Sequence, residues 1–483
     1  MAAPTGWLPE SVLQLAYLGA ATLFVLGLRG MTHPRTAARG NLLSAAGMVL
    51  AVGATVLRFE VLSPLVLLAA LLVGVAVGAW LAVTVETTQL PQLVGLFNGF
   101  GGGASALVAG AELVDRFGAA GAASVLPYDV TGAAALAGIV GAVTFWGSLV
   151  AAGRLHGVLG DPVRYAGEQA VKLAVLLVAV LAGLALVVRP GALGAALPVD
   201  WAPTYWVLVV AASVLGVLFV APIGGADMPV VIALLNACSG LAAATTGFVL
   251  DNSVLVIAGT LVGASGLILT RIMCRSMNRS LANVVFGRFG DSTPGAGDRA
   301  AALYEGNVMS TSPEEVEILL DAARRVVIVP GYGMAVGQAQ HAVAELAERL
   351  EASGVEVEFG IHPVAGRMPG HMNVLLAEAN VPYEKMRELS EINPTFPQTD
   401  VVIVTGANDV VNPAALTDES SPIAGMPVLH VWEAGTVVVN KRSLSPGYAG
   451  IPNPLFTRDN TYMLFGDAKE SMQAVLDEYD RTH

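Results

Sequence analysis

The chain has 483 residues, of which 54% are hydrophobic and 13% charged, whereas a soluble protein carries about 25% charged residues. Its net charge of −13 is unevenly placed, because residues 1–312 hold 14 basic and 14 acidic side chains while residues 313–483 hold 11 and 24. This composition indicates a membrane protein with an acidic C-terminal part. It argues against nucleic acid as a partner, since binding phosphate backbones requires clustered basic residues.

Nine stretches of the first 286 residues are long and apolar enough to cross a membrane, which takes about 20 mainly apolar residues. They lie near residues 11–28, 41–57, 64–84, 91–110, 130–150, 171–188, 204–221, 229–250 and 254–274. The first has neither a basic leader nor a small-residue cleavage site, so we expect a retained span and not a signal peptide. Both cysteines, Cys238 and Cys274, lie in apolar stretches, and we expect neither a disulfide framework nor a metal site. The sequence predicts a polytopic α-helical membrane domain over residues 1–286.

Basic residues are unevenly distributed between the loops on the two sides of this domain. The loops that share a side with the C-terminus carry Arg29, Arg35, Arg39, Arg154, Arg164, Lys172, Arg271, Arg275 and Arg279, and the others carry Arg58, Arg116 and Arg189. Lys and Arg accumulate in cytoplasmic loops. We therefore expect the C-terminal domain on the cytoplasmic side of the cell (inner) membrane.

The pattern changes after the last apolar stretch. Residues 287–312 are rich in Gly, Ser, Thr and Asp and lack apolar periodicity, which predicts a linker. Short β-branched runs then alternate with helical segments. The runs are 326–329, 355–359, 401–404, 428–431, 436–439 and 462–465. This alternation predicts a soluble α/β Rossmann-like domain over residues 313–483, with a mainly parallel sheet covered by helices.

A glycine-containing turn follows the first of these runs, in Arg325-Val-Val-Ile-Val-Pro-Gly-Tyr-Gly-Met-Ala-Val336. Gly331 would allow a tight turn and Gly333 a close approach of the backbone to a pyrophosphate, before an amphipathic helix that ends near Ser353. Val336 replaces the third glycine of the usual dinucleotide fingerprint. A strand, turn and helix whose glycines serve packing alone would show the same pattern.

Polar residues follow two further strands, at the edge where open α/β sheets collect their ligands. His362-Pro-Val-Ala-Gly-Arg367 follows the second strand, and Gly406-Ala-Asn-Asp409 follows the run 401–404. Arg367 could pair with a pyrophosphate, and Asn408 and Asp409 could bond a ribose or a carboxamide. Each residue alone is better explained as an ordinary loop residue, but their joint placement at the carboxyl ends of strands favours a nucleotide site.

Two cations and a hydroxyl end a later strand of this otherwise acidic domain. They are Lys441, Arg442 and Ser443, and they supply the chemistry that a 2′-phosphate requires. A solvated basic pair is the alternative. The glycines and tyrosine of Gly447-Tyr448-Ala-Gly450 favour the phosphate site, because they predict a flexible aromatic loop that can close over a cofactor.

Polar side chains inside membrane spans are costly and are usually functional or paired. The candidates for a proton path are Asn98, Asn236, Asp227, Glu86 and Ser265. Hydrogen bonding between helices is an equally good explanation for each of them.

Over nearly its whole length the chain resembles the β subunit of proton-translocating NAD(P) transhydrogenases. The most specific segments are Gly224–Val231, Met277–Ser280, Pro330–Val336, Phe359–Asn373, Gly406–Asp409, Asn412–Pro413, Ser421–Pro427, Lys441–Ser443 and Gly466–Lys469. The resemblance implies hydride transfer between NADH and NADP⁺, coupled to proton translocation across the membrane.

The resemblance also implies that NADP(H) binds this chain in the reverse of the usual dinucleotide orientation, with Lys441, Arg442 and Ser443 at the 2′-phosphate. An acidic residue that follows the second strand, Glu358, would then not select NAD. The expected cofactor contacts are Gly331, Tyr332, Gly333, Val336, His362, Val364, Ala365, Gly366, Arg367, Met368, Pro369, Gly406, Ala407, Asn408, Asp409, Val410, Gly425, Met426, Lys441, Arg442, Ser443, Leu444, Ser445, Pro446, Gly447, Tyr448, Asp467 and Ala468. Asp409 also matches the catalytic acid through which the family links proton movement to nucleotide binding.

In this family the hydride passes directly between two nicotinamides, so catalysis is largely positioning. NAD(H) would lie on a partner α subunit, and the protomers would form a homodimer. Many members carry a histidine at the position of Asn98. This chain resembles the branch whose α part is split into a soluble and a small membrane subunit, which implies that the small subunit provides the histidine. A transporter or channel that senses NADP without redox activity is the alternative function.

Overall fold

The computed structural model describes residues 9–31, 34–58, 64–120, 127–160, 165–188, 201–278, 280–286, 303–368 and 370–483. The chain divides into two compact units. One contains the helices of the N-terminal part as far as Ile268. The other comprises Leu269–His483, with the short stretches 160–162 and 223–232 grouped with it.

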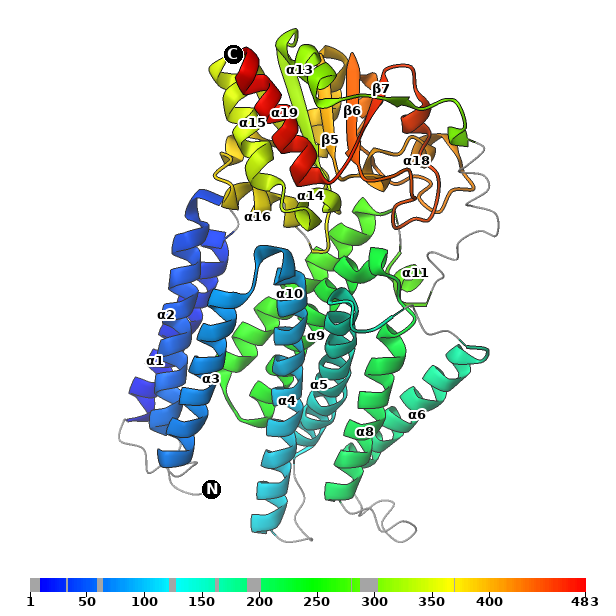
Figure 1. The fold of residues 1–483 in the computed structure, drawn as a ribbon. Helices are drawn as coiled ribbons and strands as arrows, with labels where there is room; N and C mark the ends of the chain where they lie inside the picture. The colour runs from blue at the N-terminus through cyan, green and yellow to red at the C-terminus, as the bar shows by residue number, and fades with distance from the viewer. Residues whose placement is uncertain are drawn as a thin grey trace. The chain divides into compact units, whose positions relative to one another are not determined.

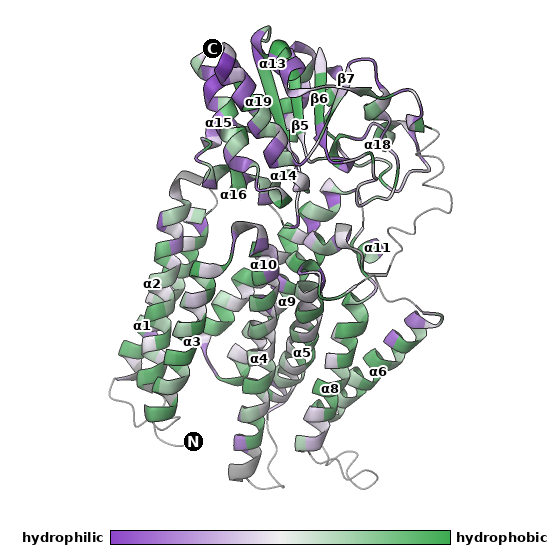
Figure 2. Cartoon of the chain, in the orientation of Figure 1, coloured by the Kyte–Doolittle hydropathy of each residue, from purple (hydrophilic) through white to green (hydrophobic). Residues whose placement is uncertain are grey.

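The N-terminal part is built from long apolar helices (Figures 1 and 2). They are α1 (Glu10–Met31), α2 (Pro34–Arg58), α3 (Pro64–Thr84), α4 (Leu90–Ala120), α5 (Tyr128–Leu155), α6 (Glu168–Val187), α8 (Trp201–Val220), α9 (Met228–Val249) and α10 (Ser253–Ser276), followed by the short α11 (Leu281–Phe286). Among the described residues, eight helices are long and apolar enough to cross a membrane, and α3 is apolar over the shorter stretch Leu68–Thr84. Each predicted span therefore coincides with a helix.

Small residues let α4 and α5 pack closely. A Cβ atom added to Gly102 would lie 2.7 Å from the carbonyl oxygen of Gly141, and one added to Gly141 would lie 2.5 Å from the carbonyl oxygen of Gly102. In lipid, where apolar burial does not drive helices together, such close backbone packing stabilises helix pairs. Tyr205 of α8 adds a hydrogen bond of 2.5 Å to the carbonyl oxygen of Ala106 in α4.

The C-terminal part forms one seven-stranded, fully parallel sheet. Its strands are β1 (Met309–Ser310), β2 (Arg325–Pro330), β3 (Glu356–Ile361), β4 (Met386–Glu388), β5 (Val401–Thr405), β6 (Thr436–Lys441) and β7 (Thr461–Phe465). The order across the sheet is β1-β7-β6-β5-β2-β3-β4. Apart from the edge strand β1, this is the doubly wound order of dinucleotide-binding folds, and it reverses between β2 and β5. The predicted Rossmann-like architecture is confirmed.

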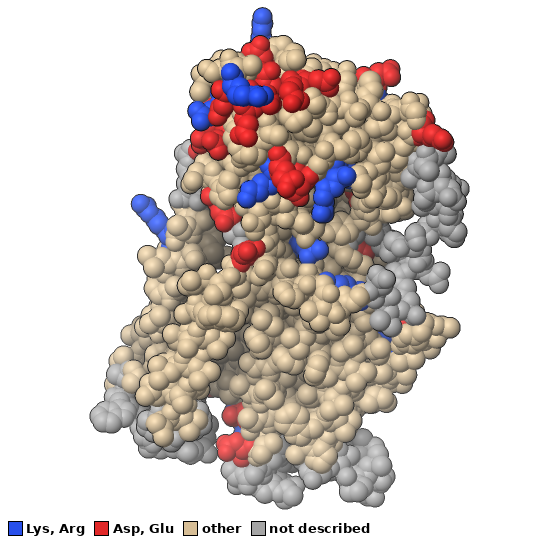
Figure 3. Space-filling model, in the orientation of Figure 1, with Lys and Arg blue, Asp and Glu red and all other residues tan. Residues whose placement is uncertain are grey.

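Alternate residues of the central strands pack into two cores, one on each face of the sheet. On one face Val326 and Ile328 of β2 pack with helices, and on the other Val327 and Val329 pack with loops and short turns. The helices of this part are α13 (Pro313–Asp321), α14 (Tyr332–Val336), α15 (Gln340–Ala352), α16 (His371–Glu378), α17 (Leu389–Ile392), α18 (Ala414–Thr417) and α19 (Ala468–Thr482). Charged side chains crowd the visible outer surface of this unit, whereas the visible surface of the long helices is nearly free of them (Figure 3).

Four details differ from the sequence expectations. Val428–Val431 is buried but forms no strand, because Pro427 precedes it and its residues pack as a loop that ends in a 3₁₀ turn. The short strand β4, which is polar, was not anticipated. β1 lies inside the segment assigned to the linker. The helix expected after the glycine turn is two helices, α14 and α15, separated at Gln338, whose φ is 51°.

Glu358 also lies elsewhere than expected. It does not follow a strand but sits within β3, where it accepts a hydrogen bond from Arg325 of β2 and another, of 2.6 Å, from Nε of Arg387 in β4. The carboxylate is thus committed to an ion triad that joins three neighbouring strands. This position explains why it need not influence the choice of cofactor.

Candidate cofactor site

The loops that follow five strands line one cavity of about 450 Å³. The contributing strands are β2, β3, β5, β6 and β7, and the cavity therefore lies at the carboxyl edge of the sheet, where the strand order reverses. This is the place where open α/β sheets bind ligands, because the loops diverge there to opposite faces.

Glycines bring the β2 and β5 loops into backbone contact at the centre of this edge. The amide of Gly331 donates to the carbonyl of Thr405 at 2.9 Å, and that of Gly333 donates to the carbonyl of Gly406 at 2.8 Å. A Cβ on Gly331 would lie 2.4 Å from backbone atoms of Ala407, and Gly406 itself has a φ of 68°. No larger residue fits at these positions. The turn thus uses its glycines for packing as well as for lining the cavity.

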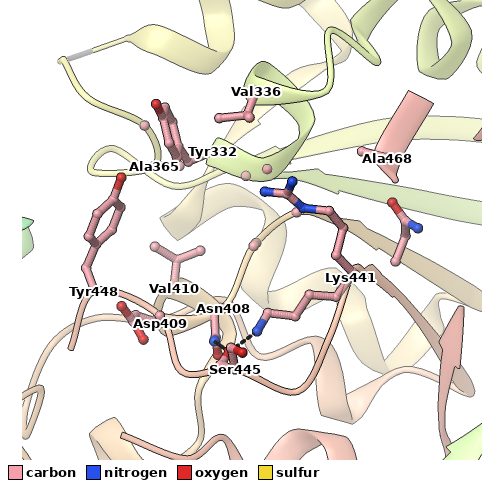
Figure 4. A pocket seen from close by; sticks show the side chains of 18 of the residues that line it. Tyr332, Val336, Ala365, Asn408, Asp409, Val410, Lys441, Ser445, Tyr448 and Ala468 are labelled. Carbon is pink, nitrogen blue, oxygen red and sulfur yellow. Dashed lines mark hydrogen bonds between the residues drawn. The ribbon is translucent and has the colours of Figure 1, made fainter. Parts of the chain in front are cut away.

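Asp409, in the β5 loop, is an acid buried within the site (Figure 4). Its Oδ2 accepts a hydrogen bond of 3.0 Å from the amide of Ala449, which lies in the loop after β6. Burial raises the pKa of this carboxyl, while the backbone amides and Lys441 favour its charged form. Asp409 therefore joins the β5 loop to the loop that carries Tyr448, and its proton affinity depends on how closely the two loops pack.

Lys441 ends β6 and points across the cavity toward Ser445 (Figure 4). Its Nζ donates to the carbonyl oxygen of Ser445 and lies 5.5 Å from the ring centroid of Phe456. Burial lowers the pKa of this ammonium group, and the nearby Asp409 opposes the shift. Arg442 and Ser443, the next residues, are exposed and also line the cavity. The site thus presents two cationic side chains and a hydroxyl at one end.

Aromatic side chains form the opposite side. The rings of Tyr332, from α14, and Tyr448 lie 6.1 Å apart, on the side of the cavity away from Ala468 (Figure 4). The guanidinium of Arg367 lies 4.5 Å from the ring of Tyr332, a distance typical of cation–π contacts. Burial raises the pKa of Tyr332 to about 12, so its hydroxyl stays protonated at neutral pH.

Two buried histidines hold the loop after β3 in place. His362 places its Nε2 2.7 Å from the carbonyl of Pro427, and its Nδ1 accepts from the amide of Val364 at 3.2 Å. These contacts define the neutral tautomer with the proton on Nε2. His371 accepts from the amide of Arg367 at 3.0 Å. Burial lowers the pKa of both imidazoles to about 4.

Most of the expected cofactor contacts come together in this cavity. Those that line it are Gly331, Tyr332, Gly333, Val336, Val364, Ala365, Gly366, Gly406, Ala407, Asn408, Asp409, Val410, Met426, Lys441, Arg442, Ser443, Ser445, Pro446, Gly447, Tyr448, Asp467 and Ala468. His362, Arg367, Met368, Gly425 and Leu444 are not among the lining residues. Pro369 lies outside the residues that the structure describes.

Five lining residues were missed by sequence reasoning: Met277, Gly337, Ile423, Asn440 and Gly466. Gly337 and Gly466 adjoin predicted contacts, so proximity to them was an available signal. Asn440 is a polar residue inside a β-branched strand and could have been singled out for that reason. Ile423 carries no such signal, because an apolar loop residue reaches the site only through folding.

The five candidates for a proton path lie at different places in the helical part. Asn98 is in α4 and is 7% exposed, Asn236 is in α9, and Ser265 is in α10. Glu86 is exposed between α3 and α4, and Asp227 is buried in a 3₁₀ turn before α9. The last two therefore do not lie within the long helices. A Cβ on Gly101 of α4 would lie 2.6 Å from Oγ of Ser239 in α9. These two helices therefore approach closely at Gly101, which follows Asn98 in α4.

The side chains around the cavity suit the binding of a dinucleotide and do not suggest covalent catalysis by a protein nucleophile. The cavity has cations at one end, aromatic rings at the other and glycine backbone between them. Among the described residues, no three His, Cys, Asp or Glu side chains cluster so as to hold a metal ion. The fold and the site define a membrane protein with a Rossmann-like α/β unit.

Comparison with known proteins identifies the family. The family model for the NAD(P) transhydrogenase beta subunit matches residues 13–478. Two relatives from Rhodospirillum rubrum, each described as NAD(P) transhydrogenase subunit beta, are 47% identical to this chain over 469 residues, which cover 97% of this chain and 99% of each relative. The chain belongs to the NAD(P) transhydrogenase beta subunit family, as the sequence motifs predict.

Proposed function

We propose that this transhydrogenase subunit binds NADP(H) in the cavity at the carboxyl edge of its sheet and exchanges hydride with NAD(H) held by an α subunit, coupled to proton translocation. The observation that carries the proposal is the set Lys441, Arg442 and Ser443 at the end of β6, in an otherwise acidic unit. Two cations and a hydroxyl match the charge and the hydrogen-bonding capacity of a 2′-phosphate, which NAD(H) lacks.

The position of these groups also supports a reversed dinucleotide. The cations follow β6, on the far side of the point where the strand order reverses, while Tyr332 and the loop after β3 lie on the other side. An adenosine end held at Lys441 would direct the nicotinamide toward Tyr332 and Tyr448. The bound cofactor supplies the hydride chemistry, and the protein positions its ring and excludes water.

Asp409 is suited to link protonation with cofactor binding. Its carboxyl is buried between the β5 loop and the loop that carries Tyr448, and burial raises its pKa. A change of charge there would alter the packing of the two loops over the cofactor, since an ionised buried carboxylate needs hydrogen bonds that a neutral one does not. Asn98, Asn236, Asp227, Glu86 and Ser265 would lie along the proton path.

The wider assembly follows from the family and from the distribution of charge. The proposed organisation is a membrane domain over residues 1–286, a linker over 287–312 and an NADP(H) domain over 313–483 on the cytoplasmic side, where the more basic loops lie. The α part would be split into a soluble and a small membrane polypeptide, and the protomers would pair as a homodimer. An NADP-sensing transporter without redox activity is the competing function.

Calorimetric titration of the purified chain with NADP⁺ and, separately, with NAD⁺ tests the cofactor assignment. We expect tight binding of NADP⁺ and much weaker binding of NAD⁺. Binding of neither by folded protein would remove the basis of the proposed function. Addition of an NAD(H)-loaded α subunit then separates the two functions, because only a transhydrogenase transfers hydride to the bound NADP⁺.

A further inference from the structure

Tyr304 is not among the predicted cofactor contacts, yet it packs against residues that support the cofactor site. It lies within residues 287–312, the stretch assigned to the linker, shortly before β1. The side chain is buried, with 8% of its surface exposed. Its hydroxyl accepts a hydrogen bond of 2.7 Å from the amide of Asn453, and its ring lies 6.0 Å from that of Phe456.

The two residues that Tyr304 contacts each support a residue of the cavity. The ring of Phe456 lies beneath Lys441, with Nζ 5.5 Å from the ring centroid. Asn453 is fully buried, and its Nδ2 donates to the carbonyl oxygen of Asn408 at 3.1 Å. Both Lys441 and Asn408 line the cavity. Tyr304 is therefore one residue removed from the site along two independent contacts.

We propose that Tyr304 is a positioning residue for the NADP(H) site, which fixes Lys441 through Phe456 and the β5 loop through Asn453. This inference rests on the proposed function. The amide of Asn453 is buried, and without the hydroxyl of Tyr304 it would lose its acceptor, so the loop would shift to find another.

The first test is Tyr304→Phe, which keeps the ring and removes the acceptor. NADP⁺ binding to the full-length chain is measured by calorimetry. We expect the Kd to rise about fivefold, the effect of one lost hydrogen bond. The matched control is Tyr479→Phe, since Tyr479 is equally buried but packs on the other face of the sheet, away from the cavity lining. It should leave the Kd unchanged.

A double-mutant cycle distinguishes positioning from a general loss of stability. The hydroxyl of Tyr304 acts on the site through Asn453, so Tyr304→Phe should cost less affinity in an Asn453→Ala background than in the wild type. If the hydroxyl only stabilises the fold, the two losses add in full or the Kd of folded Tyr304→Phe stays unchanged, and the proposal is overturned. Should Tyr304→Phe not fold, Phe456→Leu replaces the ring that links Tyr304 to Lys441 and should also weaken NADP⁺. Unchanged affinity in that variant counts against the proposal.

The two proposals fail in different ways. Wild-type protein that does not bind NADP⁺ overturns the proposed function. Wild-type protein that binds NADP⁺, together with a Tyr304→Phe variant of equal affinity, overturns only the role of Tyr304.

Discussion

Specificity at the scale of single residues depends on a few side chains that strand ends bring into one cavity. Lys441 is held by the carbonyl of Ser445 and by the ring of Phe456, whereas Arg442 is exposed beside it. One cation is thus pre-positioned and the other is free to adjust to a ligand. A phosphate that meets both would form charge-assisted hydrogen bonds, which are about twice as strong as neutral ones.

Replacing both cations tests their role directly. Lys441→Ala combined with Arg442→Ala should weaken NADP(H) by at least about 100-fold, since each charge-assisted bond contributes roughly 1.5–3 kcal/mol. Binding of the analogue that lacks the 2′-phosphate should change far less. Calorimetry with both ligands measures the difference, with Lys385→Ala, a surface lysine paired with Glu351, as the control. Equal weakening of both ligands would contradict the assignment.

The buried histidines predict a decline of stability in acid. The pKa of His362 is about 4 in the folded state and 6.5 in its ordinary range, so the unfolded chain binds more protons between these values. Stability should therefore fall as the pH drops from 6.5 toward 4, by about 2 kcal/mol for this residue between pH 7 and pH 5. Urea unfolding of a fragment that begins at Leu303 measures it. His362→Gln should reduce the slope, whereas His341→Gln, at an exposed position, should not.

At the scale of elements, the sheet is held in register by more than its backbone ladder. Glu358 of β3 pairs with Arg325 of β2 and Arg387 of β4, and only 11% of its side chain is exposed. A carboxylate shared by two guanidinium groups is stable at low exposure only while both partners remain. The triad joins β2, β3 and β4 through their side chains. It does not include the loops after the strands, which line the cavity.

Removing the shared charge should weaken the fold without changing the site. We expect Glu358→Gln to lower the free energy of unfolding by about 1–3 kcal/mol, because two guanidinium groups lose a charged acceptor. The Kd for NADP⁺ should stay the same, since Glu358 does not line the cavity. Glu356→Gln is the control: its carboxylate is 60% exposed and lies 3.5 Å from Arg325, so the loss should be below about 1 kcal/mol. A large change in cofactor affinity would contradict this expectation, because it would show that the triad influences the geometry of the cavity.

At the scale of the whole molecule, the proposed function assigns proton movement and cofactor binding to separate parts of the chain. The long helices carry Asn98 in a buried position, whereas the residues proposed to meet a dinucleotide lie in the loops of the sheet. Coupling between the parts must therefore pass through connections that both share. Tyr304, near the start of the α/β unit, is proposed to be one such point, because it packs against Phe456 and its hydroxyl bonds to Asn453 beside the site.

Asn98→Ala tests this separation. Loss of the amide should impair proton-coupled hydride transfer by vesicles that contain the assembled enzyme, while the Kd of the purified chain for NADP⁺ stays unchanged. Thr22→Ala, which removes an exposed hydroxyl from α1, should affect neither measurement. Loss of NADP⁺ affinity on replacing Asn98 would contradict the assignment of proton movement and cofactor binding to separate parts of the chain.

The sequence by itself determined the parts of this protein that depend on local pattern. Nine apolar stretches correspond to nine helices because backbone groups in lipid must be satisfied within the segment. The parallel sheet followed from β-branched runs separated by helices, and the basic pair Lys441 and Arg442 was visible because it interrupts an acidic region. In each case the signal lies within a few neighbouring residues.

Only the tertiary structure decided what depends on distant contacts. Val428–Val431 has the composition of a strand, but its backbone groups bond to Val410 and to the side chain of Asn393 instead of to a strand, which leaves it a loop. Glu358 belongs to an ion triad because strand order places Arg325 and Arg387 on either side of it. Tyr304 reaches Asn453, 149 positions away, only because the sheet folds between them. Contacts of this kind are set by the packing of whole elements, and no local pattern encodes them.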